Sequence, residues 1–163
     1  MIHAVLIGRE NLTPFLRGIP GSVEAELRKE VEAITIKLLR KVKAEKLSGQ
    51  VLKNRTGTLR AGVNYKMQVT ERSIYGVVGT NKEYAAAHEY GFDGVVNVRQ
   101  HLRMQVVAFG KRMIAPKQVT VKAHTAHMRL PERSFLRSAL RDMQGEIKDR
   151  LGAAIKRGAN ARK

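Results

Sequence analysis

The sequence predicts an α+β fold: a four-stranded antiparallel sheet made of two hairpins, one of them long and basic, packed by two long amphipathic helices plus one short helix. Apolar residues repeat at spacings of three and four near both ends of the chain, as on one face of a helix. Between these stretches, apolar and polar residues alternate in two pairs of runs, as in hairpins. Each long helix has one apolar stripe, which must be buried on the sheet or on a neighbouring subunit.

The chain length suits a single domain, because 163 residues are enough to bury a sizeable core. We expect an N-terminal strand and linker over residues 1–21, one α+β domain over residues 22–157, and a basic C-terminal tail over residues 158–163 that is frayed from Gly158 onward. In the first region, the apolar run Ile2–Ile7 predicts an edge strand, and the prolines and glycines after it predict a linker.

The first long helix is predicted to begin at Ser22, a good N-cap residue, and to end at Gly49. Glutamates fill its first half and lysines and arginines its second half, which complements the helix dipole. Its apolar stripe consists of Val23, Leu27, Val31, Ile34, Leu38 and Val42.

A turn is predicted at Arg55–Leu59, where Gly57 accepts a backbone angle that other residues resist. The first hairpin follows, with strands over Val63–Val69 and Ile74–Val78. A short helix over Glu83–Tyr90 is then closed by Gly91.

The second hairpin is predicted from the alternating runs Val95–Val106 and Gln118–Met128, which flank a long tip at Val107–Lys117. We call residues 94–131 the basic ribbon, because seven lysines and arginines and no acidic residue lie between Asp93 and Glu132. The last long helix is predicted from about Pro131, with an apolar stripe formed by Leu136, Leu140, Met143, Ile147, Leu151 and Ile155.

The charge of the chain points to an anionic partner. With 31 basic and 14 acidic residues, the formal net charge is +17, which favours a polyanion or an assembly whose other subunits supply acid. The basic ribbon is the expected contact surface, for a nucleic-acid backbone or for an acidic protein face; plain solvation is the alternative. No pattern for reading base edges is present, so binding would be salt-sensitive and independent of base sequence. The expected contact residues are Arg99, Arg103, Lys111, Arg112, Lys117, Lys122 and Arg129.

No catalytic, cofactor or metal site is predicted. Cysteine is absent, which excludes disulfides and thiolate zinc sites. His124 and His127 are three residues apart on a predicted strand, so they point to opposite faces and cannot readily chelate one metal. Neither a nucleophile elbow nor a phosphate-binding loop is present, and the acidic residues fall mainly on the two helices. We therefore expect a protein that is not an enzyme. Ile2–Ile7 is too short to span a membrane, and no membrane contact is expected.

An ordered set of motifs resembles the bacteriophage minor tail component family, the tail-completion or head–tail joining (neck) proteins of tailed phages. The resemblance runs from about Ser22 to Ile155. It depends on Lys46–Leu52, Arg55–Arg60, Val78–Asn81, Tyr84-Ala85, His88–Gly91, Pro131–Leu136 and Ala139-Leu140. Ser134 departs from the family, which often has proline there, and this puts the start of the last helix in question.

The resemblance implies a non-enzymatic virion protein in the neck or the head-proximal tail, made in the host cytoplasm and assembled as a ring of six or twelve copies around the DNA path. Its implied partners are connector, tail-terminator or tail-tube proteins, with nonspecific contact to genomic DNA. Two other hypotheses come from the charge: a sequence-nonspecific nucleic-acid-binding module, and a small nuclease or toxin-like enzyme.

The motifs also have expected structural roles. Tyr84, His88 and Tyr90 either pack the short helix on the sheet edge or contact a partner. His88 and Glu89 are expected to tie that helix to the turn before the ribbon, and Phe135 and Leu136 to anchor the last helix on the core. The full set of structural motif residues is Thr56, Gly57, Leu59, Tyr84, His88, Glu89, Gly91, Phe135 and Leu136.

Overall fold

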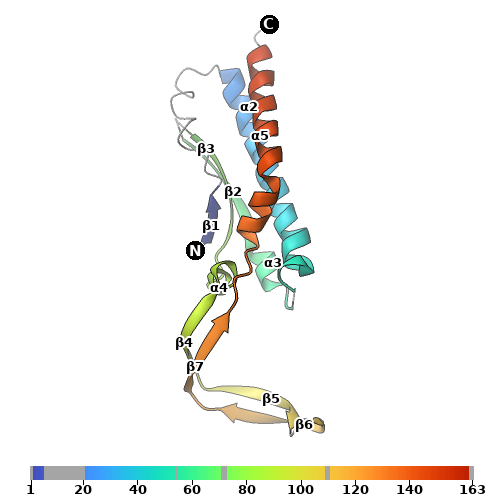
Figure 1. Cartoon of the computed structure of the whole chain (residues 1–163), viewed down its shortest axis with the longest axis vertical. Helices are drawn as coiled ribbons and strands as arrows, with labels where there is room; N and C mark the ends of the chain where they lie inside the picture. The colour runs from blue at the N-terminus through green and yellow to red at the C-terminus, as the bar shows by residue number, and fades with distance from the viewer. Residues whose placement is uncertain (1, 6–20, 54, 71–72, 109–110, 162–163) are drawn as a thin grey trace. The chain divides into compact units, whose positions relative to one another are not determined.

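The computed structural model describes residues 2–5, 21–53, 55–70, 73–108 and 111–161 of the chain. Within these residues the fold is α+β, as predicted, with two long helices packed together (Figure 1). In chain order the elements are β1 (Ile2–Val5), α2 (Gly21–Lys41), η1 (Val42–Gln50), α3 (Thr58–Gly62), β2 (Val63–Thr70), β3 (Ser73–Thr80), α4 (Tyr84–Tyr90), β4 (Phe92–Val98), β5 (His101–Ala108), β6 (Lys111–Val121), β7 (His124–Leu130) and α5 (Leu136–Asn160).

The chain divides into two compact units. The first consists of residues 1–91 with 132–163, and the second, residues 92–131, contains the basic ribbon. The division describes contacts within the folded chain, and the expectation of one folding domain over residues 22–157 stays a prediction.

The first long helix follows the predicted stripe. All six stripe residues of α2 and η1 are buried, from Val23 to Val42. The π-helical segment η1 continues α2, and the helical backbone is interrupted at Gly49, where φ is +133°. Glycine tolerates this angle and other residues rarely do, which explains why the helix stops where the sequence predicts.

The last helix differs from the prediction at both ends. It begins at Leu136 rather than near Pro131, and it continues to Asn160, so the expected fraying from Gly158 is wrong. Gly158 is buried because α2 approaches it closely: a Cβ atom there would lie 2.4 Å from the Cα of Val23. The Ser22 hydroxyl also donates a 2.9 Å hydrogen bond to the Gly158 carbonyl. Small residues on α5, including the fully buried Ala139 and Ala154, let the two helices pack at short range.

The prediction of one four-stranded sheet is wrong. Strand β3 pairs antiparallel with β1 on one side and β2 on the other, whereas β4 pairs with β7 and β5 with β6 in separate sheets. The predicted edge strand is confirmed over Ile2–Val5, at one edge of the first sheet. In the first sheet, β1 occupies the edge of β3 opposite β2.

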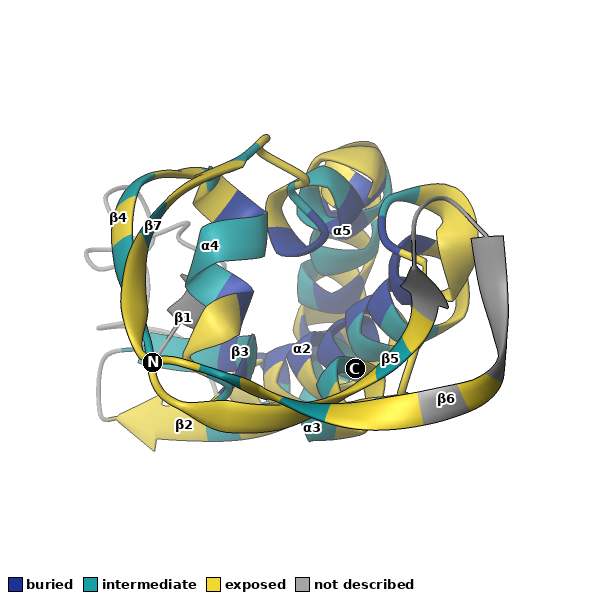
Figure 2. Cartoon of the chain, turned by 90° about the horizontal axis from the view of Figure 1, so that it is seen from below, coloured by how far each residue is buried: buried dark blue, intermediate teal, exposed yellow. Residues whose placement is uncertain are grey.

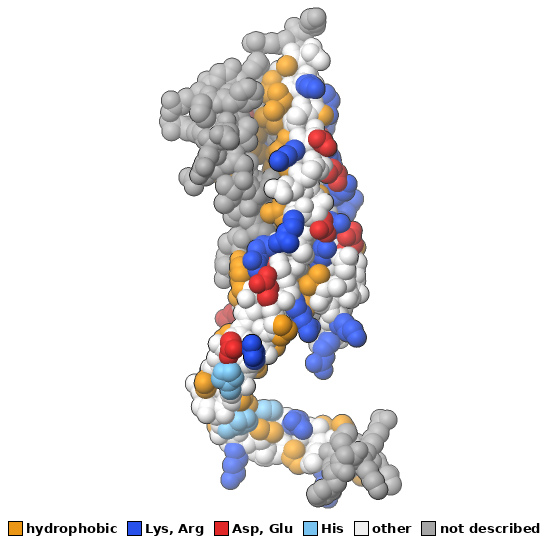
Figure 3. Space-filling view, viewed as in Figure 1, with side chains coloured by type: hydrophobic (Ala, Val, Ile, Leu, Met, Phe, Trp, Pro, Cys, Tyr) orange, Lys and Arg blue, Asp and Glu red, His pale blue; other side chains and the backbone are white. Residues whose placement is uncertain are grey.

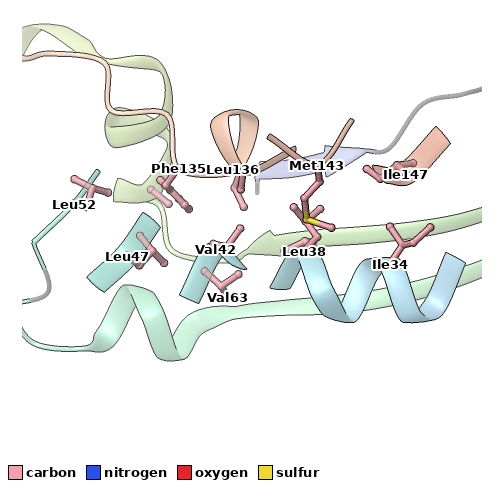
Figure 4. Packing of buried hydrophobic residues seen from close by; sticks show 13 residues of the cluster. Ile34, Leu38, Val42, Leu47, Leu52, Val63, Phe135, Leu136, Met143 and Ile147 are labelled. Carbon is pink, nitrogen blue, oxygen red and sulfur yellow. The ribbon is translucent and has the colours of Figure 1, made fainter. Parts of the chain in front are cut away.

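The core lies between the helical pair and the first sheet (Figure 4). Helix α2 contributes Ile34 and Leu38, the sheet contributes Val63 and Val78, and α5 contributes Met143 and Ile147, among others. Phe135 and Leu136 are 0% and 1% exposed, which confirms their predicted anchoring role. Coloured by burial, the strands of the second unit are exposed or intermediate wherever they are described (Figure 2).

Helix α2 packs on β3 through one close contact. A Cβ atom built on Gly76 would lie 1.7 Å from the Thr35 Oγ1 atom, so only glycine fits at this position of the strand. Thr35 is itself buried, and its hydroxyl donates a 2.6 Å hydrogen bond to the Val31 carbonyl one turn earlier.

Ion pairs join the polar edges of α2–η1 and α5. Glu30 binds both Arg150 (2.5 Å) and Arg157 (2.7 Å), and Lys37 binds Glu146 (2.5 Å). The Lys46 side chain is only 6% exposed, and its ammonium group pairs with Asp142 at 2.7 Å. Four acidic residues of the long helices, Glu26, Glu30, Asp142 and Glu146, are thus used between the helices themselves.

These pairs shift the acidity of the carboxyl groups. Burial raises the pKa of Glu30, but hydrogen bonds from Arg150 and Arg157 outweigh it and bring the pKa below its ordinary value of 4.5. A hydrogen bond from Lys37 lowers the pKa of Glu146 below 4.5, and one from Lys46 lowers the pKa of Asp142 below 3.8.

We predict that Gly76→Ala destabilises the protein by about 1–3 kcal/mol, because the added methyl group overpacks the contact with Thr35. The matched control is Gly145→Ala on α5, where nothing lies within 4 Å of the new Cβ. That change is expected to stabilise the helix by up to about 1 kcal/mol. Urea unfolding measures both free energies; a Gly76→Ala protein as stable as the parent would contradict the close packing of α2 on β3.

We predict that the melting temperature falls as the pH drops below 4.5, the ordinary value for Glu30 and Glu146. Their pKa values are lowered by folding, so the unfolded chain binds more protons in this range; the stabilisation is complete above 4.5 and is lost as the pH falls through the folded values. The double variant Glu30→Gln/Glu146→Gln should show a shallower acid decline than the parent.

The control is Glu24→Gln/Glu32→Gln, which removes the same charge from exposed α2 carboxylates that make no ion pair among the described residues. In this control, the melting temperature should fall with decreasing pH as steeply as in the parent protein. Melting temperatures are measured by circular dichroism between pH 3 and pH 7. If they fall equally steeply with pH in the two double variants, the interhelical ion pairs do not explain the acid decline.

Candidate functional site

The basic ribbon is one hairpin whose two strands are interrupted between the β4–β7 and β5–β6 ladders. Val98 lies opposite His124, and His101 lies opposite Val121, so equal numbers of residues separate the two ladders on each strand. Residues directly opposite each other share a face, and faces alternate along each strand. The pairing therefore sorts the side chains of each ladder into two faces.

The β4–β7 ladder has an apolar face and a polar face. Its apolar face is formed by Phe92, Val96, Val98, Ala126, Met128 and Leu130, together with Gly94 and His124. The opposite face presents Asp93, Val95, Asn97, Thr125, His127 and Arg129. His124 and His127 thus lie on opposite faces, as the odd spacing predicted.

The β5–β6 ladder is more exposed. Leu102 and Met104 share one face and are 62% and 55% exposed, while Arg103 and Lys117 lie on the other face. Pairing slips between Gln105 and Val107, with four residues of β6 opposite one of β5.

The predicted long tip is wrong, because β5 and β6 remain paired as far as Ala108 and Lys111. Pro116, inside the predicted tip, lies in the slipped segment, where the ladder needs no N–H from it. The two residues between the strands, 109 and 110, lie outside the described part of the chain.

The expected contact residues spread along the ribbon. Arg99 and Lys122 lie in the break between the two ladders, Arg103 on β5, Lys117 on β6 and Arg129 on β7, and all five are exposed. Lys111 and Arg112 lie at the start of β6, and their side chains are outside the described structure.

Charge compensation within the ribbon unit is confined to its base. Asp93 lies 3.0 Å from the His127 Nε2 atom and 3.5 Å from the Arg129 guanidinium. No ion pair involves Arg99, Arg103, Lys117 or Lys122 within the residues that the structure describes. On the face in view in Figure 3, the β5–β6 segment shows Lys, Arg and His side chains and no acid, whereas the helical pair shows both signs.

A second cluster lies in the first unit, at the start of α5. The Glu89 side chain, 1% exposed, accepts hydrogen bonds from the backbone N–H groups of Phe135, Leu136 and Arg137 at 2.8–2.9 Å. It also accepts one from the Ser134 hydroxyl at 2.9 Å. These N–H groups have no partner inside the helix, so a carboxylate from another helix caps α5. Ser134, the departure from the family pattern, contributes to the cap.

The cap replaces the role expected for Glu89. We expected it to tie α4 to the turn before the ribbon, and it instead ties α4 to the segment after the ribbon. The Arg133 N–H donates to the His88 carbonyl at 2.8 Å, and Arg137 binds both the Glu89 carbonyl (2.6 Å) and its carboxylate (3.2 Å). The two chain segments that lead into and out of the ribbon are therefore bonded to each other within the first unit.

The short helix α4 buries Ala85 and Glu89, and its aromatic residues stay exposed. Tyr84 is 45% exposed and Tyr90 56%, so of the two roles expected for them, burial against the sheet edge is wrong and contact with a partner stays a prediction; His88 is half-buried. The Arg137 guanidinium lies over the Tyr90 ring, 4.6 Å from its centroid, and the Tyr84 and His88 rings meet edge to face at 6.2 Å. Gly91 ends the helix with φ at +78°, as predicted.

The predicted turn is also in place. Gly57 has φ at +74° immediately before α3, which confirms the left-handed conformation that the motif suggested. The Thr56 and Thr58 hydroxyls lie 3.0 Å apart, and Leu59 packs half-buried against the core.

Sequence reasoning missed two features of this cluster. One is the Glu89 cap, whose signal was an acid on an otherwise apolar helical face. The other is a cavity lined by Thr56, Gly57, Leu59, Tyr84 and His88 together with cations from three segments. Two of those cations, Arg55 and Arg60, already flank the Thr56-Gly57 motif in the sequence.

Within the described residues, no group of three or more His, Asp or Glu side chains is placed to hold a metal ion. None of the described helices is long and apolar enough to cross a membrane. No family model, curated protein or solved structure significantly matches the chain.

We predict that Glu89→Gln destabilises the protein by about 2–4 kcal/mol, because the amide loses the charge and turns an N–H donor toward helix N–H groups. The control is Glu132→Gln, which removes an exposed partner of the same Arg137 and should cost less than about 1 kcal/mol. Thermal and urea unfolding measure both. An equal loss of unfolding free energy in the two variants would show that the buried Glu89 cap stabilises the fold no more than the exposed Glu132 ion pair does.

Proposed function

We propose that the chain is a structural, non-enzymatic virion protein that acts in the neck or head-proximal tail of a tailed phage, as a subunit of a ring around the DNA path. The observation that carries the proposal is the basic ribbon. Arg99, Arg103, Lys117 and Lys122 are exposed and make no ion pair among the described residues. Seven basic residues against one acidic residue give the ribbon unit, residues 92–131, a formal charge of +6, which suits an anionic partner.

The geometry of the motifs supports the same family. Residues far apart in the sequence meet in the first unit: Glu89 hydrogen-bonds to Phe135 and Leu136, and Leu59 and Tyr84 line one cavity. A resemblance whose separate motifs make direct contacts is supported better than one whose motifs are scattered over the fold.

In either arrangement, the cationic side chains of the ribbon would bind through charge attraction alone. In a ring lumen, its cations would face the phosphates of passing DNA without reading bases, because such contacts carry no sequence information. In the other arrangement, the ribbon reaches an acidic groove on the adjoining connector, tail-terminator or tail-tube protein. The resemblance implies six or twelve copies per ring.

A second candidate is a sequence-nonspecific nucleic-acid-binding module. The net charge of +17 favours it, since the first unit is also basic once the ribbon unit is set aside. Such a module would bind DNA as a monomer, and log Kd would change with log salt by about 0.9 for each phosphate contact.

The test compares two triple charge reversals. Arg99→Glu/Arg103→Glu/Lys117→Glu changes the ribbon, and Arg40→Glu/Lys148→Glu/Lys156→Glu makes the same charge change on exposed helical positions. In phage particles carrying the ribbon variant we expect separate heads and tails by electron microscopy, whereas the helical variant should give joined particles. Circular dichroism checks that both proteins are folded.

Joined, infectious particles from the ribbon variant would contradict the proposed role of the ribbon. Light scattering on the purified parent protein, alone and with isolated tails, separates the two candidates. A stable ring supports the virion protein; a salt-sensitive monomer–DNA complex that never forms an oligomer supports the binding module.

A further inference from the structure

The first unit contains a cavity of about 840 Å³ lined by η1, α3, α4 and the segment before α5. Its volume falls in the range of about 300–1,000 Å³ that is usual for ligand sites. Nothing in the ribbon hypothesis uses it, and all of its lining residues belong to the first unit.

The inner wall of the cavity is apolar and belongs to the core. Leu47 and Leu52 line it while being 3% and 8% exposed, and both are members of the main core cluster, where Figure 4 shows them at one end. Leu59 packs on the same cluster, and the half-exposed Tyr84 ring forms part of the edge. A wall built on packed core residues is held in shape before any ligand arrives.

The rim is cationic. Lys53, Arg55, Arg60 and Arg133 line the cavity, and no Asp or Glu is among its described lining residues. None of the four cations makes an ion pair within the described residues. Arg133 is held in place at its backbone by the hydrogen bond to the His88 carbonyl.

We propose that this cavity binds an acidic peptide segment of a partner protein, with one bulky apolar side chain against the leucine wall and flanking carboxylates on the rim. Arginine suits carboxylates because its planar guanidinium can donate two parallel hydrogen bonds. Burial of the apolar side chain then supplies the hydrophobic part of the binding energy.

A peptide fits better than a nucleic acid. Proteins hold single-stranded nucleic acids on aromatic side chains that stack with successive bases. The inner wall of this cavity is aliphatic, and among the described lining residues the rings are those of Tyr84 and His88. Phosphate contacts alone would leave the leucine wall unused. The inference concerns a site in the first unit and does not depend on the proposed virion role or on the ribbon.

The probe is a fluorescein-labelled set of short synthetic peptides in which one Phe, Leu, Ile or Met is flanked by glutamates. Fluorescence anisotropy with the purified full-length protein measures binding. We expect at least one peptide to bind, and binding to be lost when its apolar residue is changed to Ser or its glutamates to Gln.

Two matched pairs of variants locate the site. Arg55→Glu/Arg60→Glu should weaken binding roughly tenfold or more, whereas Arg40→Glu/Arg141→Glu, with the same charge change at exposed positions of α2 and α5, should change it by less than about twofold. Tyr84→Ala should weaken binding, and Tyr90→Ala, on the same helix but outside the cavity, should not. Both tyrosines are about half exposed, so each variant is expected to fold.

Several outcomes would overturn the proposal: no peptide of the set binds, the two arginine pairs weaken binding equally, or the Ser-substituted peptide binds as well as its parent. Displacement of the peptide by oligothymidylate from the parent and from the ribbon variant alike would assign the cavity to nucleic acid instead. A failure of ring assembly would leave this site unaffected, so the two proposals are tested separately.

Discussion

The buried carboxylate of Glu89 is the interaction on which the first unit depends. It lies on α4, yet it satisfies the N-terminal N–H groups of α5 and the Ser134 hydroxyl. A helix start without such partners would leave several buried N–H groups unbonded, at about 1–3 kcal/mol each. The same contacts join the chain on either side of the ribbon. The 40-residue ribbon unit can therefore leave the first unit and return to it without opening the core, because the segments on either side of it are bonded to each other.

Four acidic residues of α2 and α5 form ion pairs between the two long helices. Glu26, Glu30, Asp142 and Glu146 bind lysines and arginines across α2–η1 and α5, in partly screened positions where each pair contributes modestly. Close packing of α5 on α2 at Gly158 brings those partners within reach. Within the described residues, the ribbon cations Arg99 and Arg103 and the cations around the cavity make no ion pair, and the same holds for exposed helical cations such as Arg40.

The two cationic surfaces differ in chemistry. The ribbon is extended and presents its cations over paired strands, with exposed apolar residues such as Leu102 on the opposite face, which suits a long, repetitive anion or a broad acidic surface. The cavity is concave, with a leucine wall and a rim that includes Arg55, Arg60 and Arg133, which suits one short segment with both charge and an apolar side chain. The joining role that we propose would use both kinds of surface, since an extended cationic ribbon can hold a polyanion without reading sequence and a concave cavity can select a partner.

The sequence by itself determined the features that depend on local periodicity and on single residues. The stripe from Val23 to Val42, the alternation in both hairpins, the opposite faces of His124 and His127 and the positive φ of Gly57 all follow from spacing or from glycine, and the structure has each of them. The surplus of cations in the ribbon is likewise a property of composition.

Only the tertiary structure decided what depends on residues distant in the chain. Glu89 caps α5, and Gly158 packs against Val23, only because segments far apart in the sequence meet in the fold. Ser22 and Gly158, which are 136 residues apart, are hydrogen-bonded to each other. The division of the two hairpins into different sheets is likewise a property of the tertiary structure. Periodicity describes which face of an element is apolar, but it carries no information about which other element covers that face. The cavity is a further case, because only folding brings Arg133 and Tyr84 to the cations Arg55 and Arg60 on one rim.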